Sequence, residues 1–251
     1  LRSMGFDDTD LPTYKKYQNR LPAVIEDTID NNSIVNGFPI VFDNVWQDFV
    51  SSLTPGSKVN VAVDIEKLGS MSRHPIVSIG LVYGTDDGYV RYAQRYNIAA
   101  DWRPERDGGH LEDRCWDEFW SKQSEHVAAC QQHTDTPESA WKRLAERLDY
   151  LNEKGMKLRF LTDNASFDIA GCDMAYEKYL NRRPIRYTKE GRYQSVVSAD
   201  DMFDMLPADL RAFANKYIAK HCRHCQGQAH DPSADATHIY YQFVFAKAYQ
   251  Q

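Results

Sequence analysis

Two carboxylates two residues apart, Asp64 and Glu66, are the first feature of this chain that could do chemistry. They follow the β-rich run of residues 59–63, and side chains two apart on a strand point to the same face. Neighbouring acids at the end of a buried strand repel each other, and a divalent cation with oxygen ligands commonly compensates. The pattern is weak alone, because 36 acidic residues in 251 produce such pairs by chance. Two solvated acids are the simpler alternative.

Further acids follow a second predicted strand, residues 157–162. A strand, a long helix and another strand form a crossover unit, so we expect this strand to run parallel to the first. Sites in α/β proteins form at the carboxyl ends of parallel strands. Asp163 or Asp168 could therefore face the pair that contains Asp64. A plain helix cap is the alternative for either residue.

His230 and Asp235 stand at the start of a third predicted element. Asp231-Pro232 is a typical helix start, with Asp231 as the N-cap and Pro232 at the first helical position. Five residues along a helix would turn two side chains about 140° apart. If both face one site, His230 must lie on the loop before the cap.

The elements that position these residues are predicted from periodicity and turn signals. Residues 59–66, 75–83 and 89–98 are expected to form an antiparallel meander, with the hairpin signal Asp86-Asp87-Gly88 before the third strand. The fold class is therefore α/β, a mixed sheet flanked by helices, with three antiparallel strands and then parallel strands. Helices are expected near residues 43–53, 137–154, 164–179, 198–201, 206–218 and 231–244.

Length and charge set the domain organisation and the class of partner. A chain of 251 residues suits one large domain, or one domain with an appendage. We expect an N-terminal arm with a short helix over residues 1–56 and the main domain over residues 57–251. The arm is expected to be irregular over residues 4–36, and residues 1–3 resemble a cloning remnant. The net charge of −6 argues against a protein that coats nucleic acid, but not against an acidic metal centre.

The cysteines indicate a compartment and a second candidate metal site. Five cysteines cannot all pair, so a reducing, intracellular and most simply cytoplasmic setting is expected. No apolar run approaches the length of a membrane span, so no membrane partner is expected. Cys222-x-x-Cys225, with His221 and His224 beside it, could contribute to a structural zinc site. Reduced cysteines packed at a helix end are the favoured alternative.

Positive charge gathers over residues 181–194, which include Arg182, Arg183 and Arg186 with two interleaved tyrosines. Basic residues with aromatic neighbours suit single-stranded nucleic acid, through phosphate contacts and base stacking. A solvated loop explains the same composition equally well.

The three acidic motifs together resemble the DEDDh branch of the DnaQ-like (RNase T-like) 3′→5′ exonucleases. Each motif alone is weak, but their order, separations and predicted strand and helix settings agree with that family over residues 61–240. The motifs are Asp64-x-Glu66, Asn164-Ala-Ser-Phe-Asp168 and His230-x4-Asp235.

One further segment, with Trp116, Trp120 and Gln123, is similar to the phage exonuclease A and mycobacterial-exoribonuclease-like subgroup. Two features depart from the family pattern. Many members have His where Asp163 stands, and the N-terminal arm has no counterpart in the minimal domain.

The resemblance implies a ribonuclease H-like fold and a metal-dependent exonuclease. Such an enzyme hydrolyses single-stranded nucleic acid from the 3′ end to nucleoside 5′-monophosphates. Oxygen ligands select two divalent cations, Mg²⁺ or Mn²⁺, and a nearby histidine can serve as general base. By resemblance the base is His230, and the metal ligands are the carboxylates of Asp64, Glu66, Asp168 and Asp235.

Contacts to the substrate are expected beside this site. Leu68, Gly69 and Met71 should line the pocket of the terminal nucleotide. Phe167 is a stacking candidate for which a core role is favoured, and Asn164 and the three arginines are further candidates.

DNA and RNA are both open, and so is a homodimer. The alternative functions are a binding or scaffold module on the same fold, or an endonuclease on a ribonuclease H-like sheet.

Overall fold

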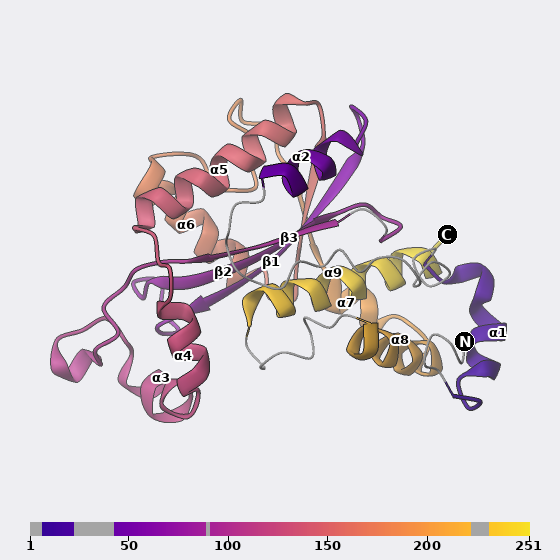
Figure 1. The fold of residues 1–251 in the computed structure, drawn as a ribbon, viewed down its shortest axis with the longest axis horizontal. Coiled ribbons are helices and arrows are strands. Elements are labelled where there is room, and N and C mark those ends of the chain that lie inside the picture. The colour runs from indigo at the N-terminus through magenta and orange to yellow at the C-terminus, as the bar shows by residue number, and fades with distance from the viewer. Residues whose placement is uncertain (1–6, 23–42, 89–90, 222–230) are drawn as a thin grey trace.

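A five-stranded sheet forms the centre of the molecule in this computed structural model (Figure 1). The structure describes residues 7–22, 43–88, 91–221 and 231–251. The strands lie in the order β3-β2-β1-β4-β5, with helices on both faces. A mixed α/β architecture with helices flanking the sheet is therefore confirmed.

The first three strands form the predicted antiparallel meander. They are β1 (Lys58–Lys67), β2 (Ile76–Gly84) and β3 (Arg91–Asn97). Every residue of β2 is buried, and β1 is buried through Val63, which explains their nearly continuous apolar sequence. Gly88 takes a φ of +84° in the turn after β2, the left-handed conformation that the Asp-Gly signal predicts.

The parallel strands are added beside β1, not beside β3. β4 (Lys157–Thr162) pairs parallel with β1, as the crossover predicts, and β5 (Ser195–Ser198) pairs parallel with β4. The order across the sheet thus differs from the order along the chain, and β1 is the central strand. No strand was predicted at β5, because its four residues, one exposed and three half-buried, carry no clear alternation.

One face of the sheet is covered by α2 (Asp43–Ser51), α5 (Pro137–Glu153) and α6 (Asp168–Leu180). The start of α5 follows the sequence prediction, since the Thr136 hydroxyl accepts a hydrogen bond from the Ser139 main-chain N–H. The apolar stripe of α5 is buried against the sheet, together with large side chains from α2, α6 and the strands, and this core includes Trp46, Phe49, Trp141, Leu144, Phe160 and Tyr176.

The opposite face is covered by α7 (Ala199–Asp204), α8 (Ala208–His221) and α9 (Pro232–Tyr249). α9 lies directly on β1 and β2 and is buried along most of its length. Asp231 caps α9 as predicted, because its carboxylate accepts from the main-chain N–H groups of Ser233 and Ala234.

Part of the N-terminal arm is ordered against this second face, which the sequence analysis did not anticipate. Helix α1 (Leu11–Tyr17) packs on α8, where Tyr17 is buried and donates a hydrogen bond to Asp209. Asp10 accepts from Lys216 at 2.8 Å. The prediction of irregular structure is wrong for these residues, because their few apolar side chains find partners nearly 200 residues later. Residues 23–42 lie outside the described part, and the domain boundary near residue 56 stays a prediction.

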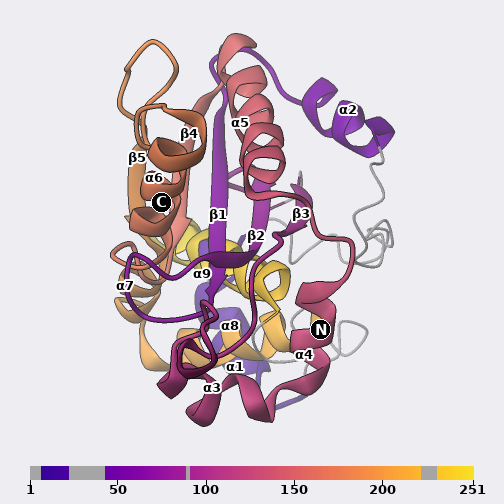
Figure 2. The same ribbon diagram turned by 90° about the vertical axis from the view of Figure 1, so that its left-hand side faces the viewer.

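A small lobe between β3 and α5 contains α3 (Asp113–Glu118) and α4 (Ser124–Gln131) (Figure 2). Its own core is built around Leu68, Leu111 and Trp120, all buried. Single-turn helices complete the described elements, at Gln18–Arg20, Glu105–Asp107 and Trp120–Lys122.

Candidate metal centre

The central strand supplies the first two acids of the site. Asp64 and Glu66 lie near the carboxyl end of β1, while Ile65 between them is buried in the core under α5 and α6. The register of β1 on β2 shifts between Glu66 and Lys67, so regular pairing ends directly after the acids. Both carboxylates are thus held at the end of the strand, on the face opposite to Ile65, as their spacing predicts.

The acids after β4 reach the same place. Asp163 follows the last residue of β4, and Asp168 is the first residue of α6. Asp168 is 2% exposed, and its carboxylate accepts from the Thr162 hydroxyl at 2.6 Å and from the Ile65 main-chain N–H at 3.3 Å. These two bonds fix the Asp168 side chain against β1.

No side chain caps the start of α6, although Asn164 and Ser166 are residue types that commonly cap helices. Phe167 occupies the N-cap position without a side-chain cap bond. The Ser166 hydroxyl instead donates to the Asn164 side chain at 2.6 Å, and both residues are exposed. The polar side chains before α6 therefore bind each other and do not cap the helix, which begins at Asp168.

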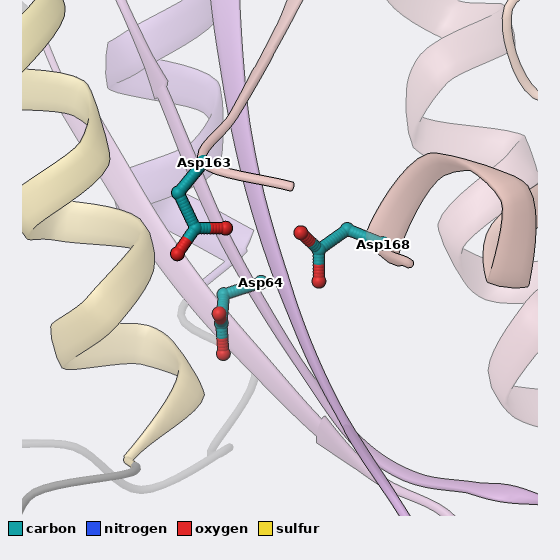
Figure 3. Close-up of side chains that lie close together, drawn as sticks. All are labelled: Asp64, Asp163 and Asp168. Atoms are coloured by element: carbon teal, nitrogen blue, oxygen red, sulfur yellow. The ribbon is translucent and has the colours of Figure 1, made fainter. Parts of the chain in front are cut away.

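Five acidic residues form two groups that share one member. One ligand oxygen from each of Asp64, Asp163 and Asp168 lies within 4.8 Å of the others, and Figure 3 shows the three side chains converging from β1, from the loop after β4 and from the start of α6. The same limit holds for Asp64, Glu66 and Asp235. Asp64 belongs to both groups. The sequence predicts Asp163 or Asp168 beside Asp64, whereas the structure brings both of them to Asp64.

Burial and the neighbouring negative charges raise the pKa values of two of these acids. Burial, and then the charges of Asp168, Glu66, Asp235 and Asp163, raise the pKa of Asp64 well above its usual value. Burial also raises the pKa of Asp168, to about 7, with a further contribution from Asp163, although the Thr162 hydrogen bond opposes the change. Clustered carboxylates whose charged forms are disfavoured gain most from a bound cation. The oxygen-only donor set fits Mg²⁺ or Mn²⁺.

Several predicted site residues fall outside the described part of the chain. His230, the expected general base, directly precedes the described Asp231, and the zinc candidates Cys222 and Cys225 lie in the same stretch. Asp235 is described, in the first turn of α9. Of the cysteines that the structure describes, Cys115, Cys130 and Cys172 are free thiols.

The residues after the acid pair are not all available to a substrate. Leu68 is fully buried in the core of the small lobe, so its side chain is not exposed to a substrate in this structure, and its place in the pocket stays a prediction. Gly69 is packed so closely that a Cβ there would lie 2.1 Å from the His74 ring. Met71, by contrast, is 52% exposed. Phe167 packs partly against the core, with the Lys67 ammonium 5.2 Å from its ring centre.

The arginine cluster lies at the far end of α6. This helix has 13 residues, which at a rise of about 1.5 Å each places the loop about 20 Å from Asp168. Arg182 makes a two-pronged ion pair with Asp149, and Arg186 binds Asp173. These two arginines neutralise acids of the fold, and their contact with nucleic acid stays a prediction. Arg183 lies on the same distant loop.

A cavity of about 310 Å³ lies on the face of the sheet that α5 and α6 cover, and none of the five acids lines it. Lys67 and Gly171 line it, and they lie close in sequence to Glu66 and Asp168 respectively. Its floor is mostly apolar, with Ile76, Ile98 and Trp141 among the lining residues. A pocket with an apolar floor and a cationic rim suits a nucleotide.

Two supporting residues were missed by the sequence analysis. His126 of α4 is buried, with its Nε2 3.6 Å from a carboxylate oxygen of Glu66. Thr162 holds Asp168. A hydroxyl directly before Asp163 could have suggested the second contact, whereas nothing in the local sequence connects His126 with Glu66, 60 residues earlier.

One family of known proteins matches most of the chain. No helix among the described residues has both the length and the apolar character needed to cross a membrane. No curated protein matches the chain. The model of one protein family matches residues 59–244, from the start of β1 to the middle of α9. The chain belongs to the family described as the 3'-5' exoribonuclease Rv2179c-like domain.

Proposed function

We propose that this protein is a metal-dependent 3′→5′ exonuclease of the DEDDh type on a ribonuclease H-like fold. It removes nucleoside 5′-monophosphates from the 3′ end of single-stranded nucleic acid, and the family description makes RNA the first substrate to test. The proposal rests on family membership together with the acids at the carboxyl ends of β1 and β4.

The observation that carries the proposal is that both acid groups share Asp64. A carboxylate common to two ligand sets is what a pair of neighbouring divalent ions requires. Asp163 and Asp168 complete one set, and Glu66 and Asp235 complete the other. Two divalent ions, when bound, supply an activated water and neutralise charge on the phosphoryl group and the leaving oxygen.

The remaining work falls to the side chains around the acids. Thr162 and the Ile65 main chain hold Asp168 in one orientation, so that one oxygen set is preorganised. His230, directly before the cap of α9, takes the proton of the attacking water as general base. The exposed Met71 contacts the terminal nucleotide, and Lys67, directly after Glu66, supplies positive charge.

Degradation of matched oligonucleotides tests this function. Single- and double-stranded RNA and DNA, labelled at the 5′ end and with either a free or a blocked 3′ hydroxyl, are incubated with Mg²⁺, Mn²⁺ or EDTA. We expect a ladder shortened from the 3′ end of single strands, 5′-monophosphate products, and no reaction in EDTA. Asp168→Asn should be inactive.

Asp173→Asn is the matched control, because this buried acid lies on the same helix and binds Arg186 instead of the acid groups. Internal cuts in a circular single strand would indicate an endonuclease. Binding without degradation by the wild-type protein would indicate a scaffold. Either result would overturn the proposal.

A homodimer, zinc at Cys222 and Cys225, and an intracellular location stay predictions from the sequence. Light scattering and metal analysis of the purified protein would test the first two directly.

A further inference from the structure

The first turn of α9 lies against the sheet at one cross-strand pair, Gly80 of β2 and Arg95 of β3. A Cβ at Gly80 would lie 1.8 Å from the Pro232 carbonyl oxygen and 2.4 Å from the Ser233 nitrogen. The helix start therefore touches the sheet backbone, and only glycine leaves room for it. Gly80 is also paired with Asp64 of β1, the strand on the other side of β2. The contact between Gly80 and the start of α9 therefore lies beside the acids.

Arg95, on the neighbouring strand β3, binds the N-cap residue of α9. Its guanidinium donates to Oδ2 of Asp231 at 2.8 Å, while Oδ1 of Asp231 accepts from the first main-chain N–H groups of α9. One carboxylate thus joins the helix end to β3. The Arg95 side chain is 17% exposed, so solvent screens this ion pair less than one at the surface. Asp235 follows one turn later, and its N–H donates to the Asp231 carbonyl oxygen at 2.9 Å.

The same guanidinium is connected to α4. Its Nε donates to Oδ1 of Asn97 at 2.9 Å, and the Asn97 amide donates to the carbonyl oxygens of Ala129 and Gln132 at the end of α4. A second nitrogen of Arg95 lies 3.4 Å from Cys130. One turn before Cys130, His126 contacts Glu66 and is stacked on Trp120.

The two helices that Arg95 holds in place, α9 and α4, both contribute to the acid group of Asp64, Glu66 and Asp235. α9 carries Asp235, and α4 presents His126 to Glu66. The spacing of Glu66 and Asp235 therefore depends on two elements far apart in sequence, α4 and α9, that share the guanidinium of Arg95. A hydrogen-bonded arginine that makes these contacts leaves little freedom to either element.

We propose that Arg95 is a positioning residue for the metal centre: its contacts with Asp231 and Asn97 set the spacing of Glu66 and Asp235 in the group that shares Asp64. This inference rests on the proposed function. Arg95 touches none of these three carboxylates in the described structure and acts through α9 and α4. Neither the family match nor the acidic motifs assign a role to it.

The test measures Mn²⁺ binding by the full chain, by titration calorimetry and by the paramagnetic resonance of free Mn²⁺, alongside kcat, KM and Tm. The variants are Arg95→Gln, Arg95→Lys and Asp231→Asn. Asparagine keeps an N-cap oxygen but loses the charge that binds Arg95. Arg159→Gln is the matched control, because Arg159 is also a strand arginine, 12% exposed, that pairs with Asp86 and lies over Phe243 of α9.

We expect Arg95→Gln to weaken one of two Mn²⁺ sites at least tenfold and to lower kcat at least tenfold, with KM changed less than twofold. Asp231→Asn should act in the same direction but no more strongly, because the contact of Arg95 with Asn97 remains, and Arg95→Lys should recover part of the affinity. The double variant Arg95→Gln/Asp231→Asn should be no worse than Arg95→Gln alone, because Arg95→Gln already removes the contact with Asp231. Arg159→Gln should alter Tm but change Mn²⁺ affinity less than twofold.

Equal Mn²⁺ affinity in Arg95→Gln and Arg159→Gln, with only Tm lowered, would overturn the inference and leave the proposed function intact. A wild-type protein that binds no Mn²⁺ and degrades no oligonucleotide would overturn both. If Arg95→Gln does not fold, Asp231→Asn decides the question, since its cap and its helix remain.

Discussion

Removing one charge from the metal centre should stabilise the metal-free protein while it abolishes activity. The variant is Asp168→Asn. Burial raises the pKa of Asp168 from 3.8 to about 7 in the folded protein. Because a tenfold change in proton affinity corresponds to about 1.4 kcal/mol, the charged form costs the folded state about 4 kcal/mol above pH 7. Asparagine removes this penalty.

The gain is smaller than the full penalty, because one hydrogen bond is lost. An asparagine oxygen can still accept from the Thr162 hydroxyl, but the amide nitrogen cannot accept from the Ile65 N–H. That loss costs about 1 kcal/mol. The net stabilisation is then about 3 kcal/mol, which for a chain of this size is an increase in Tm of roughly 10 °C.

The pH dependence has a definite sign. The pKa of Asp168 is higher in the folded protein than in an unfolded chain, so the folded protein binds more protons between about pH 4 and pH 7. Wild-type stability relative to the variant therefore falls as the pH rises through this window. The difference in Tm should be largest at pH 8 and close to zero by pH 5.

Thermal unfolding in EDTA at pH 5 and pH 8, repeated with Mn²⁺, measures the effect. Mn²⁺ should raise the Tm of the wild type much more than that of Asp168→Asn. In the control Asp173→Asn the sign should reverse, because this variant leaves Arg186 without its partner. A lower Tm for Asp168→Asn in EDTA at pH 8, or a difference independent of pH, would refute the electrostatic reasoning.

Three further outcomes are expected. Asp64→Asn should lower kcat by about 10³-fold or more and weaken both Mn²⁺ sites, since Asp64 belongs to both acid groups; calorimetry that finds one intact site would contradict this. Arg182→Met should lower the free energy of unfolding in urea by about 2 kcal/mol by leaving Asp149 unpaired, and should leave oligonucleotide affinity, measured by fluorescence anisotropy, unchanged within twofold. Gly80→Ala should lower the free energy of unfolding by about 3 kcal/mol, because its Cβ overlaps the Pro232 carbonyl group; wild-type stability in the same urea titration would contradict the close contact.

Local interactions explain what could be predicted from the chain alone. The cap of α5 at Thr136, the cap of α9 at Asp231 and the turn at Gly88 each depend on bonds or dihedral angles within a few residues. The shared face of Asp64 and Glu66 follows from the two-residue period of a strand. Such features are decided by neighbours in sequence, so the sequence states them directly.

The grouping of the acids was only partly predictable. The motifs identified Asp64, Glu66, Asp168 and Asp235, but not that Asp64 is common to two groups or that Asp163 joins one of them. These facts depend on the register of β1 with β4 and on where α9 crosses the sheet. Pairing across such separations is not encoded in any one segment.

The sequence by itself thus determined the local elements, the antiparallel meander and the identity of the acids. Only the tertiary structure decided which charges are free and which side chains are covered. Arg182 forms an ion pair with an acid 33 residues away, and Leu68 is buried in the core of the small lobe. Arg95 binds Asp231, which lies 136 residues later in the chain. The physical reason is that the role of a charge or an apolar side chain depends on its partner, and the chain brings distant partners together only when it folds.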